Sequence, residues 1–144
     1  MNSYNAAQVL NGTWGELWIG GDYLAEVTAF QATVTLTKVD VNMTRKLAKY
    51  SKVVGYEGKG TIKINHVSSY FVTLMNDNMK VGKQTSVTII SKVDDPDALG
   101  AERIVIKDAV FDELSLANWE SKKNVEDSIP FTFTDWDVLD SILD

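Results

Sequence analysis

The sequence has no cysteine and a single histidine among its 144 residues. Without cysteine the chain cannot form disulfide bonds, thiolate nucleophiles or zinc sites built on sulfur. The one histidine, His66, has no second histidine or cysteine with which to share a metal ion, so we expect a surface or hydrogen-bonded residue. From these absences we predict no bound metal.

Targeting and membrane-spanning segments are missing as well. The first residues contain neither a basic segment nor an apolar core, so we expect no secretion signal and predict synthesis in a cytoplasm. No apolar run approaches the ~20 residues that cross a bilayer, so membrane insertion by this chain is not expected.

Recognisable catalytic arrangements are also lacking. The glycine-rich string 55–60 resembles a phosphate-cradling loop, but such a loop precedes a helix, whereas here another strand is expected. Asp94, Asp95 and Asp97 lack the glycine and the distal glutamate of a calcium loop. We therefore expect no catalytic residues and no cofactor, and predict that the chain is not an enzyme.

The clearest positive signal is the strand pattern over residues 24–41. At ~3.3 Å per residue this stretch would reach roughly 60 Å, whereas ordinary strands run to ~10 residues. Polar and apolar side chains alternate along it, with Gln31, Thr33, Thr35 and Thr37 on one face and Phe30, Ala32, Val34 and Leu36 on the other. A strand this long either bends between two sheets or leaves the domain as a projecting hairpin. Both interpretations favour a building block over a catalytic pocket.

The remaining pattern predicts a mainly β, antiparallel fold in one domain spanning residues 1–144. A tight turn is expected at 20–22, and the strand signal returns at 52–56 and 61–66, where Gly55, Gly58 and Gly60 indicate a bulge or a bend. One short helix is expected at about 68–80. Its apolar stripe is predicted to pack against the sheet through Val67, Phe71, Leu74, Met75 and Met79. Further strands are predicted at about 86–93, 103–114 and 129–137.

Charge is distributed unevenly along the chain, whose formal net charge is −6. Between Lys38 and Lys63 there are seven basic and two acidic residues, whereas 94–144 contain fourteen acidic and four basic ones. In the simplest interpretation both regions are solvated surfaces. Alternatively, the basic hairpin of one copy meets the acidic face of another, where complementary charge sets register and orientation.

Short strings spread over nearly the whole chain resemble one family, the XkdM-like tail tube proteins of contractile phage tails, found in PBSX-like defective phages and phage-tail-like bacteriocins. The strings are GTWGELW (12–18), AEVTAFQA (25–32), DVNM (40–43), VSS (67–69), IISK (89–92), DPD (95–97), GAER (100–103), LANWE (116–120) and PFTFTD (130–135).

The resemblance implies a β-sandwich or barrel-like subunit with a flanking helix, to which the strand pattern adds a long projecting β-hairpin at about 38–60. It also implies hexameric rings stacked into the inner tube of a virion tail or bacteriocin particle, a conduit for DNA ejection or membrane puncture. The implied partners are other copies of the chain, the tail sheath, the baseplate, the tail terminator and, in an infectious phage, DNA in transient passage. The family has no catalytic residues.

Two surfaces follow as hypotheses from the residue pattern. The lumen of the tube is predicted to be lined by Gln31, Thr33, Thr35, Thr37, Thr61, Lys63 and Asn65. The contact between rings is predicted at the hairpin tip, about 42–51, through Arg45, Lys46, Leu47, Lys49 and Tyr50. The four tryptophans, at 14, 18, 119 and 136, exceed what a core of this size usually holds and favour self-assembly. Two rival classes stay open, a small-ligand-binding β-barrel and a hydrolase acting through carboxylates.

Overall fold

The computed structural model describes residue 3 and residues 5–143, and within them one antiparallel sheet holds eight strands. Two short 3-10 turns, Ala6–Gln8 and Gly12–Trp14, precede the sheet. The strands are β1 (Gly15–Ile19), β2 (Asp22–Tyr23), β3 (Val27–Val41), β4 (Tyr50–Asn65), β5 (Ser86–Val93), β6 (Glu102–Phe111), β7 (Glu126–Phe133) and β8 (Asp135–Asp140), with helix α1 (Tyr70–Lys80) after β4.

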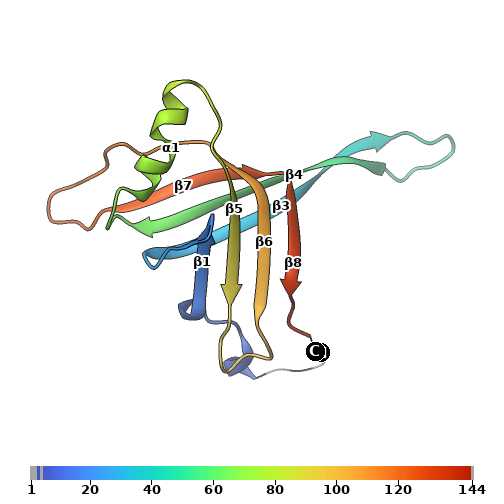
Figure 1. Ribbon diagram of the computed structural model, residues 1–144. Helices are drawn as coiled ribbons and strands as arrows, with labels where there is room; N and C mark the ends of the chain where they lie inside the picture. The colour runs from blue at the N-terminus through green and yellow to red at the C-terminus, as the bar shows by residue number, and fades with distance from the viewer. Residues whose placement is uncertain (1–2, 4, 144) are drawn as a thin grey trace.

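The sheet folds over on itself. Its strand order is β2-β1-β5-β6-β7-β4-β3, and β6 changes partner along its length. Residues 103–107 of β6 pair with β8, whereas Val110 and Phe111 pair with β7. Figure 1 shows the result: β1, β5, β6 and β8 run side by side, and β3, β4 and β7 cross them as a second layer. The predicted β-sandwich or barrel-like fold is therefore confirmed.

The core fills the space between these two layers. Ile19 of β1 and Ile106 of β6 meet Ile62 of β4 and Phe131 of β7, and all four are almost completely buried. The Phe111 ring lies 6.5 Å from Phe131, across the junction of the layers. Burial of each such side chain stabilises the fold by ~1.5–3 kcal/mol, which makes this contact the main reason the sheet stays folded.

Helix α1 closes one end of the core, as Figure 1 shows. Phe71 and Met75, one turn apart, are buried, and Leu74 packs against the same core. Val67 and Met79 are exposed, so the predicted apolar stripe is confirmed only in its middle part. Gly82, with φ of +74°, follows the helix and allows the left-handed turn that ends it. No helix among the described residues is long and apolar enough to span a bilayer.

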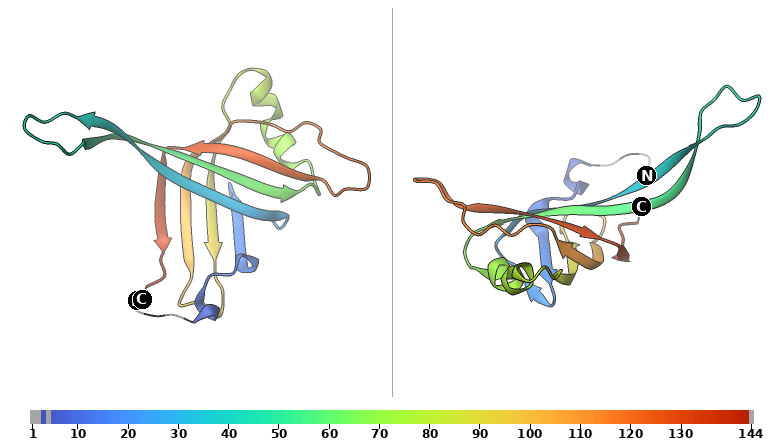
Figure 2. Two further views of the ribbon diagram at one scale, coloured as in Figure 1. Left: turned by 180° about the vertical axis from the view of Figure 1, so that it is seen from behind. Right: turned by 90° about the horizontal axis from the view of Figure 1, so that it is seen from above.

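The long strand predicted from residue 24 begins at Val27 instead. Gly20 and Gly21, both with positive φ, turn the chain so that β2 pairs briefly with β1, and a second turn then leads into β3. β3 and β4, of 15 and 16 residues, pair along their whole length. Their outer part projects from the rest of the molecule as a twisted hairpin (Figures 1 and 2), so the projecting-hairpin interpretation is correct.

The three glycines of β4 have two different roles. A bulge lies beside Gly55, because Thr37 pairs with Gly55 while the next residue, Lys38, pairs with Val53. Gly58 and Gly60 lie within the regular ladder, where the rings of β7 cover them. The predicted bulge is thus present at Gly55, while the other two glycines serve packing.

Candidate assembly surfaces

The polar residues predicted for a lumen lie together on one face of β3 and β4. Gln31 is directly opposite Thr61, and Lys63 is opposite Ala29. Gln31, Thr33, Thr35 and Thr37 are all exposed, whereas Phe30 and Val34 point to the other side and pack on the core. Asn65 ends β4 two residues beyond Lys63, on the same side of the strand. We call this outward surface of β3 and β4 the wet face.

Two charged residues of the wet face were missed in the sequence. Lys59 lies opposite Thr33, and Glu57 lies opposite Thr35. Their side chains form an exposed ion pair, with 3.3 Å between Lys59 Nζ and Glu57 Oε1. Alternation backward from Thr61 along β4 would have found both residues, because every second residue shares a face. The wet face is thus not free of charge, but one of its cations is neutralised by its neighbour.

The hairpin tip spans residues 42–49, between the end of β3 and the start of β4. Leu47 is fully exposed, and Arg45 has a φ of 62°, typical of a tight turn. Lys49 Nζ lies 3.1 Å from Asp40 Oδ2 on the same hairpin, while Arg45 and Lys46 take part in no ion pair among the described residues. The five predicted contact residues are therefore at the tip or next to it, and Lys49 already has an internal partner.

Apolar side chains extend from the tip down both strands, over a segment that we call the arm, residues 36–56. Among the described residues, eight of the 20 exposed large apolar side chains lie on the arm: Leu36, Val39, Met43, Leu47, Tyr50, Val53, Val54 and Tyr56. Only Leu47 and Tyr50 of this set were predicted from the sequence to make contacts with another copy. The others were hidden because a strand pattern in the sequence does not reveal where the core ends.

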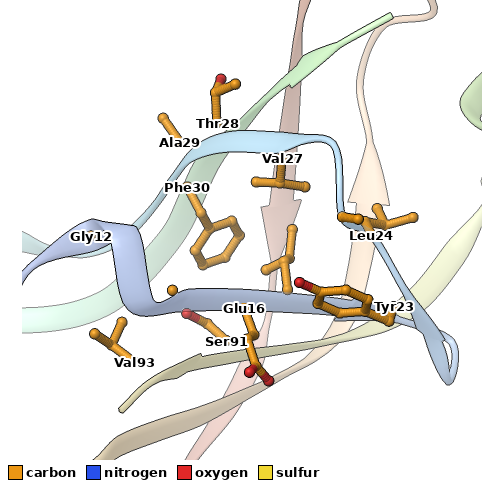
Figure 3. A pocket seen from close by; sticks show the side chains of 13 residues that line it. Gly12, Glu16, Tyr23, Leu24, Val27, Thr28, Ala29, Phe30, Ser91 and Val93 are labelled. Atoms are coloured by element: carbon orange, nitrogen blue, oxygen red, sulfur yellow. The ribbon is translucent and has the colours of Figure 1, made fainter. Parts of the chain in front are cut away.

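An open cavity of about 330 Å³ lies between β1 and the beginning of β3. Figure 3 shows Phe30 pointing from β3 toward β1, while the side chain of Glu16 on β1 points away from the Phe30 ring. Leu24 and Val27 add to the apolar lining. Because the cavity opens between two outer strands and contains one carboxylate, it offers neither an enclosed ligand site nor an acid–base pair.

Titratable groups are dispersed rather than clustered. No group of three or more His, Cys, Asp or Glu residues in the described part of the chain is placed to hold a metal ion. His66 Nδ1 lies 2.6 Å from Asp127 Oδ2, so the predicted hydrogen-bonded histidine is confirmed. Burial raises the pKa of the Tyr70 hydroxyl, and the nearby carboxylate of Asp22 raises it further. A hydrogen bond from Lys107 to Asp137 raises the pKa of that exposed lysine.

Comparison with known proteins identifies the family. The phage tail tube protein family matches residues 2–140. The chain is 32% identical over 141 residues to the phage-like element PBSX protein XkdM of Bacillus subtilis strain 168, covering 96% of both chains. The chain belongs to the phage tail tube protein family.

Solved structures share the tail tube fold at much lower identity. One is the sheath–tube complex of an extracellular contractile injection system in its extended state, with a TM-score of 0.72 and 6% identity over 94% of this chain and 98% of that chain. A second is the sheath/tube terminator of the same kind of system, with a TM-score of 0.74 and 7% identity over 97% of this chain and the whole of the other. At such identity the likeness establishes the fold alone.

The tryptophans of this tail tube family protein divide into two groups. Trp136 packs edge-on against Tyr56 at 5.3 Å and Phe133 at 6.3 Å, and Trp18 lies 5.0 Å from Tyr23. Trp119, on the β6–β7 connection, is 80% exposed, and Trp14 is 49% exposed. Of the four tryptophans only Trp136 packs against the core, in agreement with the prediction that the core does not hold all of them.

Proposed function

We propose that this protein is the structural subunit of the inner tube of a contractile phage tail or phage-tail-like bacteriocin. Copies assemble into hexameric rings, and stacked rings form a conduit for DNA ejection or membrane puncture. The observation that carries the proposal is the arm, which presents eight exposed large apolar side chains. Monomeric proteins rarely expose so much apolar surface, and a large exposed apolar patch is typical of a surface that a partner covers.

The wet face supplies the lumen in this proposal. A nucleic acid binds tightly wherever several cations neutralise its phosphates and release counterions. Gln31, Thr33, Thr35 and Thr37 give hydroxyl and amide groups, and Glu57 neutralises Lys59. Thr61, Lys63 and Asn65 continue the same surface. DNA that passes through the tube therefore contacts a wall with few cations that could bind its phosphates.

The hairpin tip supplies the contact between rings. Arg45 and Lys46 lie on the basic arm of a protein whose net charge is negative. The acidic surface of another copy is therefore electrostatically complementary to them. Leu47 and Tyr50 add an apolar part to the contact. Head-to-tail interfaces either close into a ring or continue as a filament. In a stacked tube the contacts within a ring close, whereas the contacts between rings continue along the tube.

The other partners follow from the place of a tube in such a particle. We propose that the outer surface meets the tail sheath, and that the two ends meet the baseplate and the tail terminator. The subunit is made in the bacterial host cytoplasm, carries no catalytic activity, and folds as one domain. The rival small-ligand barrel is not favoured, because the cavity between β1 and β3 is open and the core is filled by side chains.

Light scattering and negative-stain microscopy of the purified chain test the proposal. We expect rings or tubes that form as concentration rises. A compact monomer at every concentration and salt, with no tubes in micrographs, would contradict it. A ligand carrier would instead remain monomeric and bind lipophilic dyes.

A further inference from the structure

The arm has few connections to the rest of the molecule outside its own hairpin. β3 is the last strand of the sheet, and in the described part of the chain it pairs only with β4. β4 pairs with β7 from Gly58 to Asn65 and continues toward the tip without that partner. The direction of the arm therefore depends on what holds β4 just beyond Gly58.

The backbone of β4 at this point has little stiffness of its own. Gly55 and Gly58 lie at the two ends of residues 55–58, and the bulge interrupts regular pairing beside Gly55. Beyond its two chain neighbours, nothing lies within 4 Å of the point where a Cβ of Gly55 would stand. Glycine restricts the backbone least, and hinges are often formed by a few small residues. Residues 55–58 are thus the stretch at which the arm would bend.

Tyr56 lies within this stretch and connects it to the domain. Its side chain is on the core side of β4, two residues from Gly58. The Tyr56 hydroxyl donates a hydrogen bond to the backbone carbonyl of Thr134, with 2.6 Å between the two oxygens. The Tyr56 ring packs edge-on against Trp136, at 5.3 Å between ring centroids. One side chain therefore ties the arm to the corner between β7 and β8.

The Thr134 carbonyl is within reach because β7 ends beside it. The β4–β7 ladder stops at the pair of Gly58 with Phe133, and its regular continuation would place Thr134 opposite Glu57. The chain instead turns at Thr134 and enters β8, which runs away from the hairpin in Figure 1. The Tyr56 side chain thus continues the connection between β4 and the end of β7 beyond their last strand pair.

We propose that Tyr56 is a positioning residue for the arm: its bond to Thr134 fixes the direction in which the arm leaves the domain in the free subunit. This orientation is a property of the single chain, and only its use in tube growth rests on the proposed function. An arm already held in one direction loses less conformational freedom when it meets a partner, which strengthens binding.

Spin-label distances in the free subunit test this inference. Met43→Cys at the tip and Thr73→Cys on α1 are at exposed positions, and the natural chain has no cysteine, so a nitroxide can be attached at each. Tyr56→Phe then removes the hydroxyl and keeps the ring. Tyr23→Phe is the matched control, because Tyr23 is similarly exposed, 49% against 51%, and its ring also lies beside a tryptophan, at 5.0 Å. Pulsed electron paramagnetic resonance at concentrations below tube formation gives the distance distribution of each variant.

We expect one main distance between the labels in the otherwise natural chain and in Tyr23→Phe. In Tyr56→Phe the fraction of subunits outside that distance should rise ~2- to 10-fold, which is the shift in an equilibrium that loss of one hydrogen bond produces. A Tyr56→Phe distribution equal to that of Tyr23→Phe overturns the inference, because the hydroxyl then has no part in the direction of the arm.

Elongation of preformed tubes by unlabelled subunits tests the consequence for growth. Tyr56→Phe subunits should extend the tubes more slowly than Tyr23→Phe subunits, in proportion to the fraction whose arm has left the main distance. Equal rates despite a broadened distance distribution would overturn the role of Tyr56 in growth. Failure of the unmodified chain to form tubes would instead overturn the proposed function, and the distances in the free subunit would still decide the role of Tyr56 in the direction of the arm.

Discussion

Gly58 of β4 lies beneath the ring of Phe133, its direct partner on β7. A Cβ at this position would stand 2.6 Å from Phe133 Cε2, a distance that real Cβ atoms do not adopt. Gly60, two residues on, is covered in the same way by Phe131. The missing side chains let two aromatic rings of the core approach the backbone of β4 closely.

Replacement of Gly58 by alanine is expected to destabilise the subunit by ~1–3 kcal/mol, because the Phe133 ring must move and the core must repack. Gly55→Ala is the matched control, since nothing beyond its two chain neighbours lies within 4 Å of the point where its Cβ would stand. That variant should change the free energy of unfolding by no more than ~1 kcal/mol, in the stabilising direction. Urea unfolding of free subunits measures both, and equal effects would contradict the packing role of Gly58.

A second prediction concerns alkaline pH. Burial, followed by the charge of Asp22, raises the pKa of Tyr70 in the folded state, so the folded protein holds this proton more tightly than the unfolded chain. Stability from this group is therefore complete below the unfolded pKa of ~10 and is lost as pH rises through the folded value. Tyr70→Phe should weaken the decline in unfolding free energy above about pH 10. Parallel pH profiles of Tyr70→Phe and the unmodified subunit would disprove this linkage.

The wet face leads to a third prediction. Cysteines at Thr33 and Thr35 should react with polymer-linked maleimide in free subunits, where both residues are exposed. In tubes they should be shielded, because a lumen excludes the polymer while the outer surface does not. Leu116→Cys, on the exposed β6–β7 connection, is an informative comparison for labelling in the free subunit. Equal labelling of Thr33→Cys in both states would show that this face does not line a channel.

A fourth prediction tests the ion pair on the same face. Glu57→Gln removes the partner of Lys59 and leaves a cation in every subunit of the wall. DNA should then be retained by tubes at low salt and released as salt rises, because each neutralised phosphate releases counterions. Lys59→Gln is the matched control, with no added positive charge and no expected retention. If Glu57→Gln tubes retain no more DNA than Lys59→Gln tubes, Glu57 has no part in passage.

Most of the sheet could be predicted from the sequence because its cause is local. Alternation from Phe30 to Thr37 separates the wet face from the side that bears Phe30 and Val34, and the turn at Gly20 and Gly21 needs only their backbone freedom. The pairing of Gly58 with Phe133 could not be predicted, because it depends on register between strands more than 70 positions apart, as their residue numbers show. The same limit applies to the surfaces. The row from Gln31 to Thr37 was visible, whereas the uncovered state of Val39 and Val53 depends on where the core ends.

The last prediction separates the cations of the hairpin tip. The sequence presents Arg45, Lys46 and Lys49 as equivalent, but Lys49 lies 3.1 Å from Asp40 and is engaged within its own hairpin. Reversal of Arg45 and Lys46 to glutamate should therefore permit folding and single rings while it suppresses long tubes. Lys49→Gln should have little effect on tube length, because it removes a contact internal to the hairpin.

The size and salt dependence of this effect follow from exposure. Each exposed ion pair contributes ~0.2–1 kcal/mol, and repetition around a ring multiplies that small term. In ~1 M salt the Debye length falls to ~3 Å, so unmodified tubes should shorten as well. The apolar contact of Leu47 and Tyr50 is not screened by salt and should keep some stacking. Tube lengths in micrographs measure all of these, and Arg45→Glu/Lys46→Glu tubes of normal length at low salt would mean that the tip charges are only a solvated surface.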